Sequence, residues 1–141
     1  MRKIDYIFIH CTATKEGMDF RAKDIDKWHK AKGWKCIGYN WVIDLDGTIE
    51  KGRDEKEVGA HCSGYNKNSI GVVYVGGLAS DGKTPKDTRT PAQKEAMWKL
   101  VRELITRYPD AQVKGHNEVT KSKACPCFDV KETFKNVNLK R

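Results

Sequence analysis

The sequence of 141 residues lacks any long apolar run that is free of charged residues. A membrane-spanning helix needs roughly 18 such residues in succession, so we predict no membrane insertion. The first residues, Met1–Tyr6, carry positive charge, but the apolar segment that follows is short and ends at His10. This pattern predicts a first β-strand and no secretory signal peptide. We therefore expect a cytoplasmic protein, which another factor must export or release if it acts elsewhere.

Linkers rich in proline or glycine, internal repeats and low-complexity tracts are also missing. A chain of 141 residues is long enough for one domain with a substantial core. Hydrophobic residues make up 38% and charged residues 33% of the sequence, which is typical of folded globular domains. We predict a single domain over residues 1–141.

A regular cysteine framework is missing as well. The cysteines are odd in number and do not resemble the pattern of a small disulfide-rich scaffold; they are Cys11, Cys36, Cys62, Cys125 and Cys127. With no signal peptide, this favours reduced thiols in a cytoplasmic setting. We expect Cys36 and Cys62 to be small packing residues.

Basic residues outnumber acidic ones, giving a formal net charge of +8. This charge either makes a basic soluble surface or attracts an anionic polymer, such as nucleic acid or cell wall. It is spread over the chain, whereas nucleic-acid binding favours a clustered stripe. We predict no nucleic-acid partner.

The hydrophobic pattern alternates between strand-like and helix-like segments. Short β-branched or aromatic runs bounded by turn residues predict strands, and apolar residues at i, i+3 and i+4 predict helices. The expected strands are 6–11, 38–43, 48–52, 69–75 and 112–115, and the expected helices are 24–31, 91–108 and one that Asp129 caps. Thr90, Pro91 and Gln93 form a strong helix start. The fold class is α/β: one domain with a central mixed sheet flanked by helices.

Two histidines and a cysteine stand where strands end or loops begin. His10 ends the first strand, His116 follows the last strand, and Cys125 lies in the loop after it. A histidine at a strand end is more often structural than metal-binding when judged alone. Together, however, three scattered ligands leave the fourth position of a tetrahedral zinc open, which is typical of a catalytic zinc.

Several longer motifs occur in a fixed order, and together they resemble the type 2 zinc-dependent N-acetylmuramoyl-L-alanine amidases. The likeness is closest to the single-domain phage amidase lysozymes and more distant to the peptidoglycan recognition proteins. The motifs are His10–Thr14, Gly38–Asn40, Asp46–Thr48, Gly52–Arg53, His61, Gly64–Val72, Thr90–Gln93, Gly115–Glu118 and Lys123–Pro126.

The resemblance implies one Zn²⁺ ion held by His10, His116 and Cys125, with Tyr39 and Lys123 as the catalytic pair. Two departures stand out. Cys127 occupies a position where phage relatives tend to carry serine, and it offers an alternative thiol ligand. Asn40 stands where phage relatives often carry histidine.

The resemblance also implies a substrate groove, with His61, Asn66 and Asn40 as candidate wall residues. His29 is expected to be packed or capping. Glu118 is either a general base or, more commonly for such acids, a solvated or supporting group. Arg53 either forms an ion pair or meets a substrate carboxylate.

By this resemblance the protein hydrolyses the amide bond between N-acetylmuramic acid and L-alanine in peptidoglycan, as a phage or prophage endolysin. A monomer would bind muropeptide and stay in the cytoplasm until released to the cell wall. One alternative is a non-catalytic peptidoglycan-binding module of the same fold. The other is a regulator of a phage RNA polymerase, because some phage relatives also inhibit that enzyme.

Overall fold

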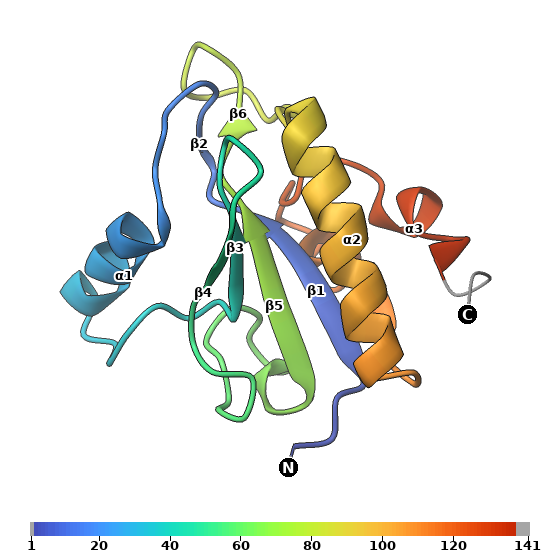
Figure 1. Ribbon diagram of the computed structural model, residues 1–141. Coiled ribbons are helices and arrows are strands. Elements are labelled where there is room, and N and C mark those ends of the chain that lie inside the picture. Colours follow the sequence, from blue (N-terminus) through green and yellow to red (C-terminus); the bar gives the residue numbers. More distant parts are fainter. Residues whose placement is uncertain (1, 138–141) are drawn as a thin grey trace.

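A mixed five-stranded β-sheet forms the centre of the computed structural model, which describes residues 2–137 (Figure 1). The strands lie in the order β4-β3-β5-β1-β7. Their bounds are β1 Tyr6–Cys11, β3 Trp41–Ile43, β4 Ile49–Lys51, β5 Ser69–Tyr74 and β7 Gln112–Gly115. Only the pairing of β3 with β4 is antiparallel in this sheet. The predicted α/β fold with a mixed sheet is confirmed.

Strand β1 lies between β5 and β7 and sets the position of the candidate ligands. Its apolar residues and those of β5 are buried, because helices cover both faces of these parallel strands. In the β1–β7 register, Ile9 pairs with Gly115. The residue that follows each member of this pair is a histidine: His10 follows Ile9, and His116 follows Gly115. The register therefore brings two imidazoles to the same edge of the sheet.

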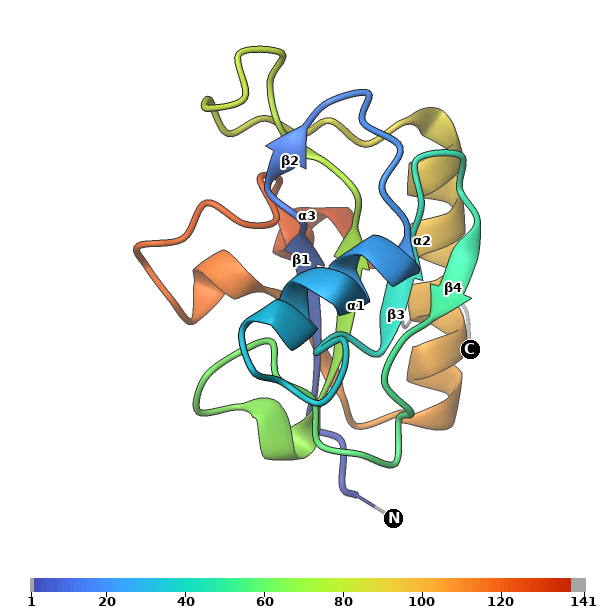
Figure 2. The same ribbon diagram turned by 90° about the vertical axis from the view of Figure 1, so that its left-hand side faces the viewer.

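Helices cover the two faces of the sheet (Figures 1 and 2). Helix α1, Ala22–Ala31, packs on one face over a small apolar cluster that includes Ile25, Val42 and Val73. Helices α2, Pro91–Arg107, and α3, Val130–Thr133, pack on the other face over the larger core. Among residues 2–137, we find no helix with both the length and the apolar character needed to span a membrane.

The predicted starts of α2 and α3 are confirmed. Thr90 Oγ1 accepts from the Gln93 N–H at 3.1 Å, and the Gln93 side chain accepts from the Thr90 N–H at 2.9 Å. Asp129 Oδ1 accepts from the Glu132 N–H at 3.0 Å at the start of α3. These side chains satisfy backbone donors that have no partner inside the helix.

Several predicted boundaries are wrong by one to three residues. Strand β3 begins at Trp41 and not at Gly38, and α1 begins at Ala22 and not at Asp24. The predictions also missed a second, two-stranded sheet formed by β2, Thr14–Lys15, and β6, Gly77–Leu78. Strands of two residues carry too few side chains to show a period. There are also two short 3₁₀ helices: Asn66–Asn68 directly precedes β5, and His116–Glu118 directly follows β7.

A buried carboxyl group links α1 to the β3–β4 hairpin. Asp44 is fully buried and accepts from Arg21 at 3.2 Å through Oδ2, while its Oδ1 has no donor among the residues that the structure describes. Burial, and after it the hydrogen bond with Glu50, raises the pKa of Asp44, against the opposing charge of Arg21. If Asp44 holds a proton, the Glu50 carboxylate is the acceptor that this proton would reach.

Because of this carboxyl group, we predict that the stability of the fold decreases as the pH rises. Because the folded state holds the Asp44 proton more tightly than the unfolded chain, stability is greatest below the ordinary carboxyl pKa of about 3.9 and is lost toward the raised value. Asp44→Asn keeps a neutral donor, so it should remove this part of the pH dependence and stabilise the protein by roughly 1 kcal/mol above neutrality. Denaturant unfolding of both proteins at about pH 5 and about pH 8 measures it. Parallel pH profiles would contradict the shared proton.

Candidate metal centre and substrate pocket

Three side chains from distant parts of the chain converge at the edge of the sheet. His10 is in β1, His116 begins the 3₁₀ helix after β7, and Cys125 lies in the loop before α3. One ligand atom from each lies within 4.8 Å of the others, in the only such group of three found among residues 2–137. Figure 2 shows the orange segment between β7 and α3, which supplies two of the ligands, extending from the edge of the sheet.

The donor set fits a tetrahedral zinc ion. Zinc binds imidazole nitrogen and thiolate sulfur at about 2.0–2.3 Å, which places its ligand atoms roughly 3–4 Å apart. The Cys125 Sγ lies 3.9 Å from His10 Nδ1. Three protein ligands would leave one position of a tetrahedral ion for water or substrate, the ligand number that is typical of open zinc sites.

The surroundings keep both histidines neutral, which metal binding requires. His10 is 1% exposed, and burial, followed by the neighbouring His61 and His116, lowers its pKa well below the ordinary value. Burial and then the Lys123 ammonium lower the pKa of His116. Near neutral pH each imidazole is therefore uncharged and has one unprotonated ring nitrogen that can bind a metal ion.

A hydrogen-bonded chain orients His10 from behind. His10 Nε2 lies 2.9 Å from His61 Nδ1, and His61 Nε2 lies 3.3 Å from Ser69 Oγ. We assign the Nε2 proton of His10 to this contact, because it leaves Nδ1 free to face Cys125. Gly71 makes room for the His61 ring, since a Cβ there would lie 2.7 Å from it. His61 thus supports the candidate ligand as well as lining a pocket.

The two thiols of the cysteine loop point in different directions. Cys125 Sγ accepts from the Cys11 N–H at 3.1 Å beside His10. Cys127 Sγ instead lies 3.3 Å from the Gly77 carbonyl oxygen and 3.9 Å from Cys11 Sγ. Cys127 is outside the group of three ligands.

A pocket of about 400 Å³ opens beside the metal centre. The candidate catalytic residues Tyr39 and Lys123 both line it, together with the candidate binding residues His61 and Asn66. The Tyr39 and His10 ring centroids are 5.2 Å apart. Burial raises the pKa of Tyr39, so its hydroxyl keeps its proton near neutral pH.

Asn66 and Asn40, two residues predicted to bind substrate, differ in where their side chains lie. Asn66 Oδ1 accepts from the N–H groups of His61 and Cys62, both at 2.9 Å, so it shapes the pocket wall that it lines. Asn40 has no exposed surface: its amide donates to the Arg53 carbonyl and accepts from the Gly71 N–H. The prediction that Asn40 contacts substrate is therefore wrong, because it joins β3 to its neighbours from inside.

Two further polar residues have backbone roles. Arg53 is buried and donates to the carbonyl oxygens of Ile37, Val58 and Cys36, so the backbone occupies its guanidinium, and no acidic side chain among residues 2–137 forms an ion pair with it. Glu118 Oε2 accepts from the Gly115 N–H at 2.7 Å, so one of its carboxylate oxygens supports the backbone that leads to His116.

His29 is packed, as predicted. Its Nδ1 accepts from the Gly38 N–H at 2.8 Å, and its ring lies 4.5 Å from the Trp34 ring, measured between centroids. Trp34 and Lys32 also line the pocket of Tyr39, and sequence reasoning missed both. They follow the end of α1, where an aromatic residue and a lysine carry no signal of their own.

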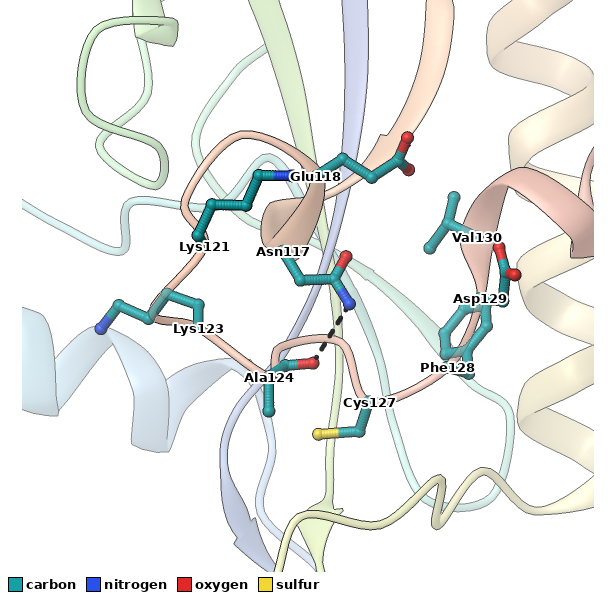
Figure 3. A pocket seen from close by; sticks show the side chains of 9 residues that line it. All are labelled: Asn117, Glu118, Lys121, Lys123, Ala124, Cys127, Phe128, Asp129 and Val130. Atoms are coloured by element: carbon teal, nitrogen blue, oxygen red, sulfur yellow. Dashed lines mark hydrogen bonds between the residues drawn. The ribbon is translucent and has the colours of Figure 1, made fainter.

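A second hollow of about 600 Å³ lies between the loop that carries Lys123 and the start of α3 (Figure 3). Its lining residues are Asn117, Glu118, Lys121, Lys123, Ala124, Cys127, Phe128, Asp129 and Val130. Figure 3 shows the hydrogen bond from the Asn117 amide to the Ala124 carbonyl oxygen, 3.5 Å long, which closes the loop. Lys121 lines this hollow and not the pocket of Tyr39.

An open site of two imidazoles and a thiolate, set at the edge of an α/β sheet, defines a candidate metal-dependent hydrolase. Comparison with known proteins identifies the family. Residues 1–128 match the model of the N-acetylmuramoyl-L-alanine amidase family, and the chain belongs to that family.

The relatives agree with this family. The endolysin of Escherichia phage T7 is 44% identical over 135 residues, which cover 96% of this chain and 88% of that protein. The endolysin of Klebsiella phage KP32 is 44% identical over 133 residues, covering 94% and 87%. The resemblance predicted from the motifs is confirmed.

Solved structures show the same fold. The N-acetylmuramoyl-L-alanine amidase LysC from Clostridium intestinale URNW has a TM-score of 0.80 at 30% identity, covering 97% of this chain and 87% of that one. The bumblebee peptidoglycan recognition protein PGRP-SA has a TM-score of 0.77 at 28% identity, covering 96% and 83%. The protein is an N-acetylmuramoyl-L-alanine amidase of the phage endolysin type, a hydrolase that cleaves peptidoglycan.

Proposed function

We propose that this amidase holds one Zn²⁺ ion with His10, His116 and Cys125 and cleaves muropeptide bound in the pocket of Tyr39 and Lys123. The observation that carries the proposal is the convergence of three ligand atoms within 4.8 Å. The neutral imidazoles and the adjoining pocket support it. A non-catalytic binding module would need neither a thiol ligand nor a positioned lysine and tyrosine.

When bound, zinc supplies Lewis-acid activation of the amide carbonyl and of a water molecule. The protein's own part is to hold charge and exclude solvent. The carbonyl oxygen gains negative charge as the amide is attacked, and donors placed around it lower the barrier. We assign this role to the Lys123 ammonium and to the Tyr39 hydroxyl, which burial keeps protonated.

The substrate is proposed to lie along the same pocket. In one solved relative, at 28% identity and a TM-score of 0.77, the ectodomains of peptidoglycan recognition proteins LCa and LCx are bound to tracheal cytotoxin. In this chain His61 and Asn66 line the pocket beside Tyr39, and we propose that they contact the bound muropeptide. We further propose that the enzyme acts as a monomer, since one chain supplies all three ligands, and that it stays in the cytoplasm until another factor releases it to the wall.

Removal and return of the metal test the proposal. A chelator should abolish release of peptide from peptidoglycan, and added zinc should restore it. Because distant segments join through a substantial core, the metal-free protein should keep its circular dichroism spectrum. Full activity after verified metal removal would contradict the proposal, and unfolding of the metal-free chain would show a structural metal instead.

The bond between His61 and His10 predicts a loss of zinc affinity in His61→Ala. Partners behind a metal-ligating histidine fix its tautomer and orientation, and their loss typically costs about 10- to 100-fold in metal affinity. Competition with a chromogenic chelator measures the dissociation constant. His29→Ala is the matched control, since His29 lines the same pocket but bonds only to the Gly38 backbone. Equal zinc affinity in the two variants would show that His61 only lines the pocket.

A further inference from the structure

Two thiols outside the proposed ligand set face each other next to the metal centre. The Sγ atoms of Cys11 and Cys127 are 3.9 Å apart. Cys11 ends β1 and is 5% exposed, while Cys127 is partly exposed in the loop. A disulfide has an S–S length of about 2.05 Å, so the sulfurs need to approach by roughly 2 Å.

The loop holds Cys127 in an unfavourable backbone conformation that presents its sulfur to Cys11. Its φ is 71°, in the left-handed region that residues with a Cβ adopt rarely. A hydrogen bond of 2.7 Å from the Cys127 N–H to the Ala124 carbonyl fixes this turn. Opposite, a Cβ on Gly77 would lie 2.5 Å from Cys11 Sγ, so the glycine leaves room for the paired thiols.

We propose that Cys11 and Cys127 form a disulfide in an oxidising compartment, and that this bond fastens the Cys125 loop to the end of β1. Cys11 adjoins His10, and Cys127 lies two residues after Cys125, so the bond would join the chain segments that carry two ligands. Peptidoglycan lies outside the cytoplasmic membrane, where disulfides persist, whereas the cytosol keeps thiols reduced. The reduced thiols expected from the sequence then describe the enzyme before release.

The oxidant is a small-molecule disulfide such as glutathione disulfide. The Cys127 thiolate attacks one sulfur of it and releases one glutathione thiolate. The Cys11 thiolate then attacks the Cys127 sulfur of the mixed disulfide and releases the second. Two thiol protons go to solvent and two electrons go to the oxidant. Cys127 is only partly exposed and Cys11 is buried, so the exchange is slow and needs long incubation.

Cys125 is the competing thiol in this cluster. If Cys125 binds zinc, its sulfur does not take part in thiol–disulfide exchange. This part of the argument rests on the proposed metal site. The prediction is therefore a Cys11–Cys127 bond in the zinc-loaded protein, with Cys125 absent from every cross-link.

The test oxidises zinc-loaded protein with glutathione disulfide for hours, blocks free thiols by alkylation and maps the peptides by mass spectrometry. We expect loss of two hydrogens, a cross-linked peptide joining the Cys11 and Cys127 segments, and unchanged zinc content. The thermal midpoint should rise by roughly 5–15 °C and return on reduction, because the bond closes a long loop. Cys127→Ser should show neither change, whereas Cys36→Ser should behave as the wild type.

Cross-links that contain Cys125, glutathione adducts without a Cys11–Cys127 bond, or a lowered midpoint would overturn the proposal. Zinc content is also measured on the reduced protein before the oxidant is added. A protein without zinc therefore refutes the metal assignment separately, and zinc-loaded protein without the cross-link refutes the disulfide alone.

Discussion

Cys125→Ser should lose most of its bound zinc and its hydrolysis of peptidoglycan. A neutral hydroxyl is a much poorer zinc ligand than a thiolate, so the remaining two imidazoles hold the ion weakly. Loss of the ion removes several kcal/mol of transition-state stabilisation, or roughly 100- to 10,000-fold in turnover. Elemental analysis and a peptidoglycan turbidity assay measure the two effects.

Cys127→Ser is the matched control for this prediction. It removes a thiol from the same loop, but Cys127 Sγ faces Gly77 and Cys11 and lies outside the ligand group. Assayed under reducing conditions, it should keep both zinc and activity close to the wild type. If the two variants exchange behaviours, the ligand is Cys127 and the loop rearranges when it binds metal.

Lys123→Ala and Tyr39→Phe should each lower turnover by about 100- to 1,000-fold, the usual effect of removing one donor to a developing oxyanion. Zinc content should stay unchanged, because neither side chain belongs to the ligand group. The double variant should lose less than the product of the two effects, since both donors act on one oxygen. Lys123→Arg keeps the charge but is larger and planar, so it should also lose turnover.

Lys121→Ala is the control for Lys123. Both lysines are exposed on the same loop, but Lys121 lines the hollow beside α3 and not the pocket of Tyr39. Its removal changes the net charge equally, so a loss of general attraction to the wall would appear in both variants. Full turnover of zinc-loaded Lys123→Ala would show that the lysine is a solvated loop residue.

The sequence predicted the centre of the fold well because buried parallel strands leave a strong pattern. The apolar runs of β1 and β5 and the capped start of α2 were found within one or two residues. Pairing across the sheet is a property of the whole chain. The register that joins Ile9 to Gly115 could not be read from either strand alone, although it explains why His10 and His116 meet.

Side-chain direction was the part that sequence could not supply. Asn40 and Tyr39 are neighbours in one motif, yet Tyr39 lines the pocket and Asn40 points into the protein toward Gly71. Arg53 is of a residue type that usually lies at the surface, but it donates to three backbone carbonyl groups, two from the Cys36–Ile37 segment and one from its own loop. Such buried hydrogen bonds depend on tertiary packing, which leaves no periodic signal. The separation of Cys125 from Cys127 likewise depends on the turn between them.

The most direct test titrates zinc into metal-free enzyme and follows the appearance of new N-terminal alanine from peptidoglycan. Release of alanine amino groups identifies the cleaved bond, and the titration counts the ions that the reaction needs. We predict that alanine release rises in proportion to added zinc and stops rising at one equivalent in the wild type, with no such rise in Cys125→Ser. Alanine release by metal-free protein, or an end point unrelated to one equivalent, would contradict the assignment of a single zinc ion to His10, His116 and Cys125.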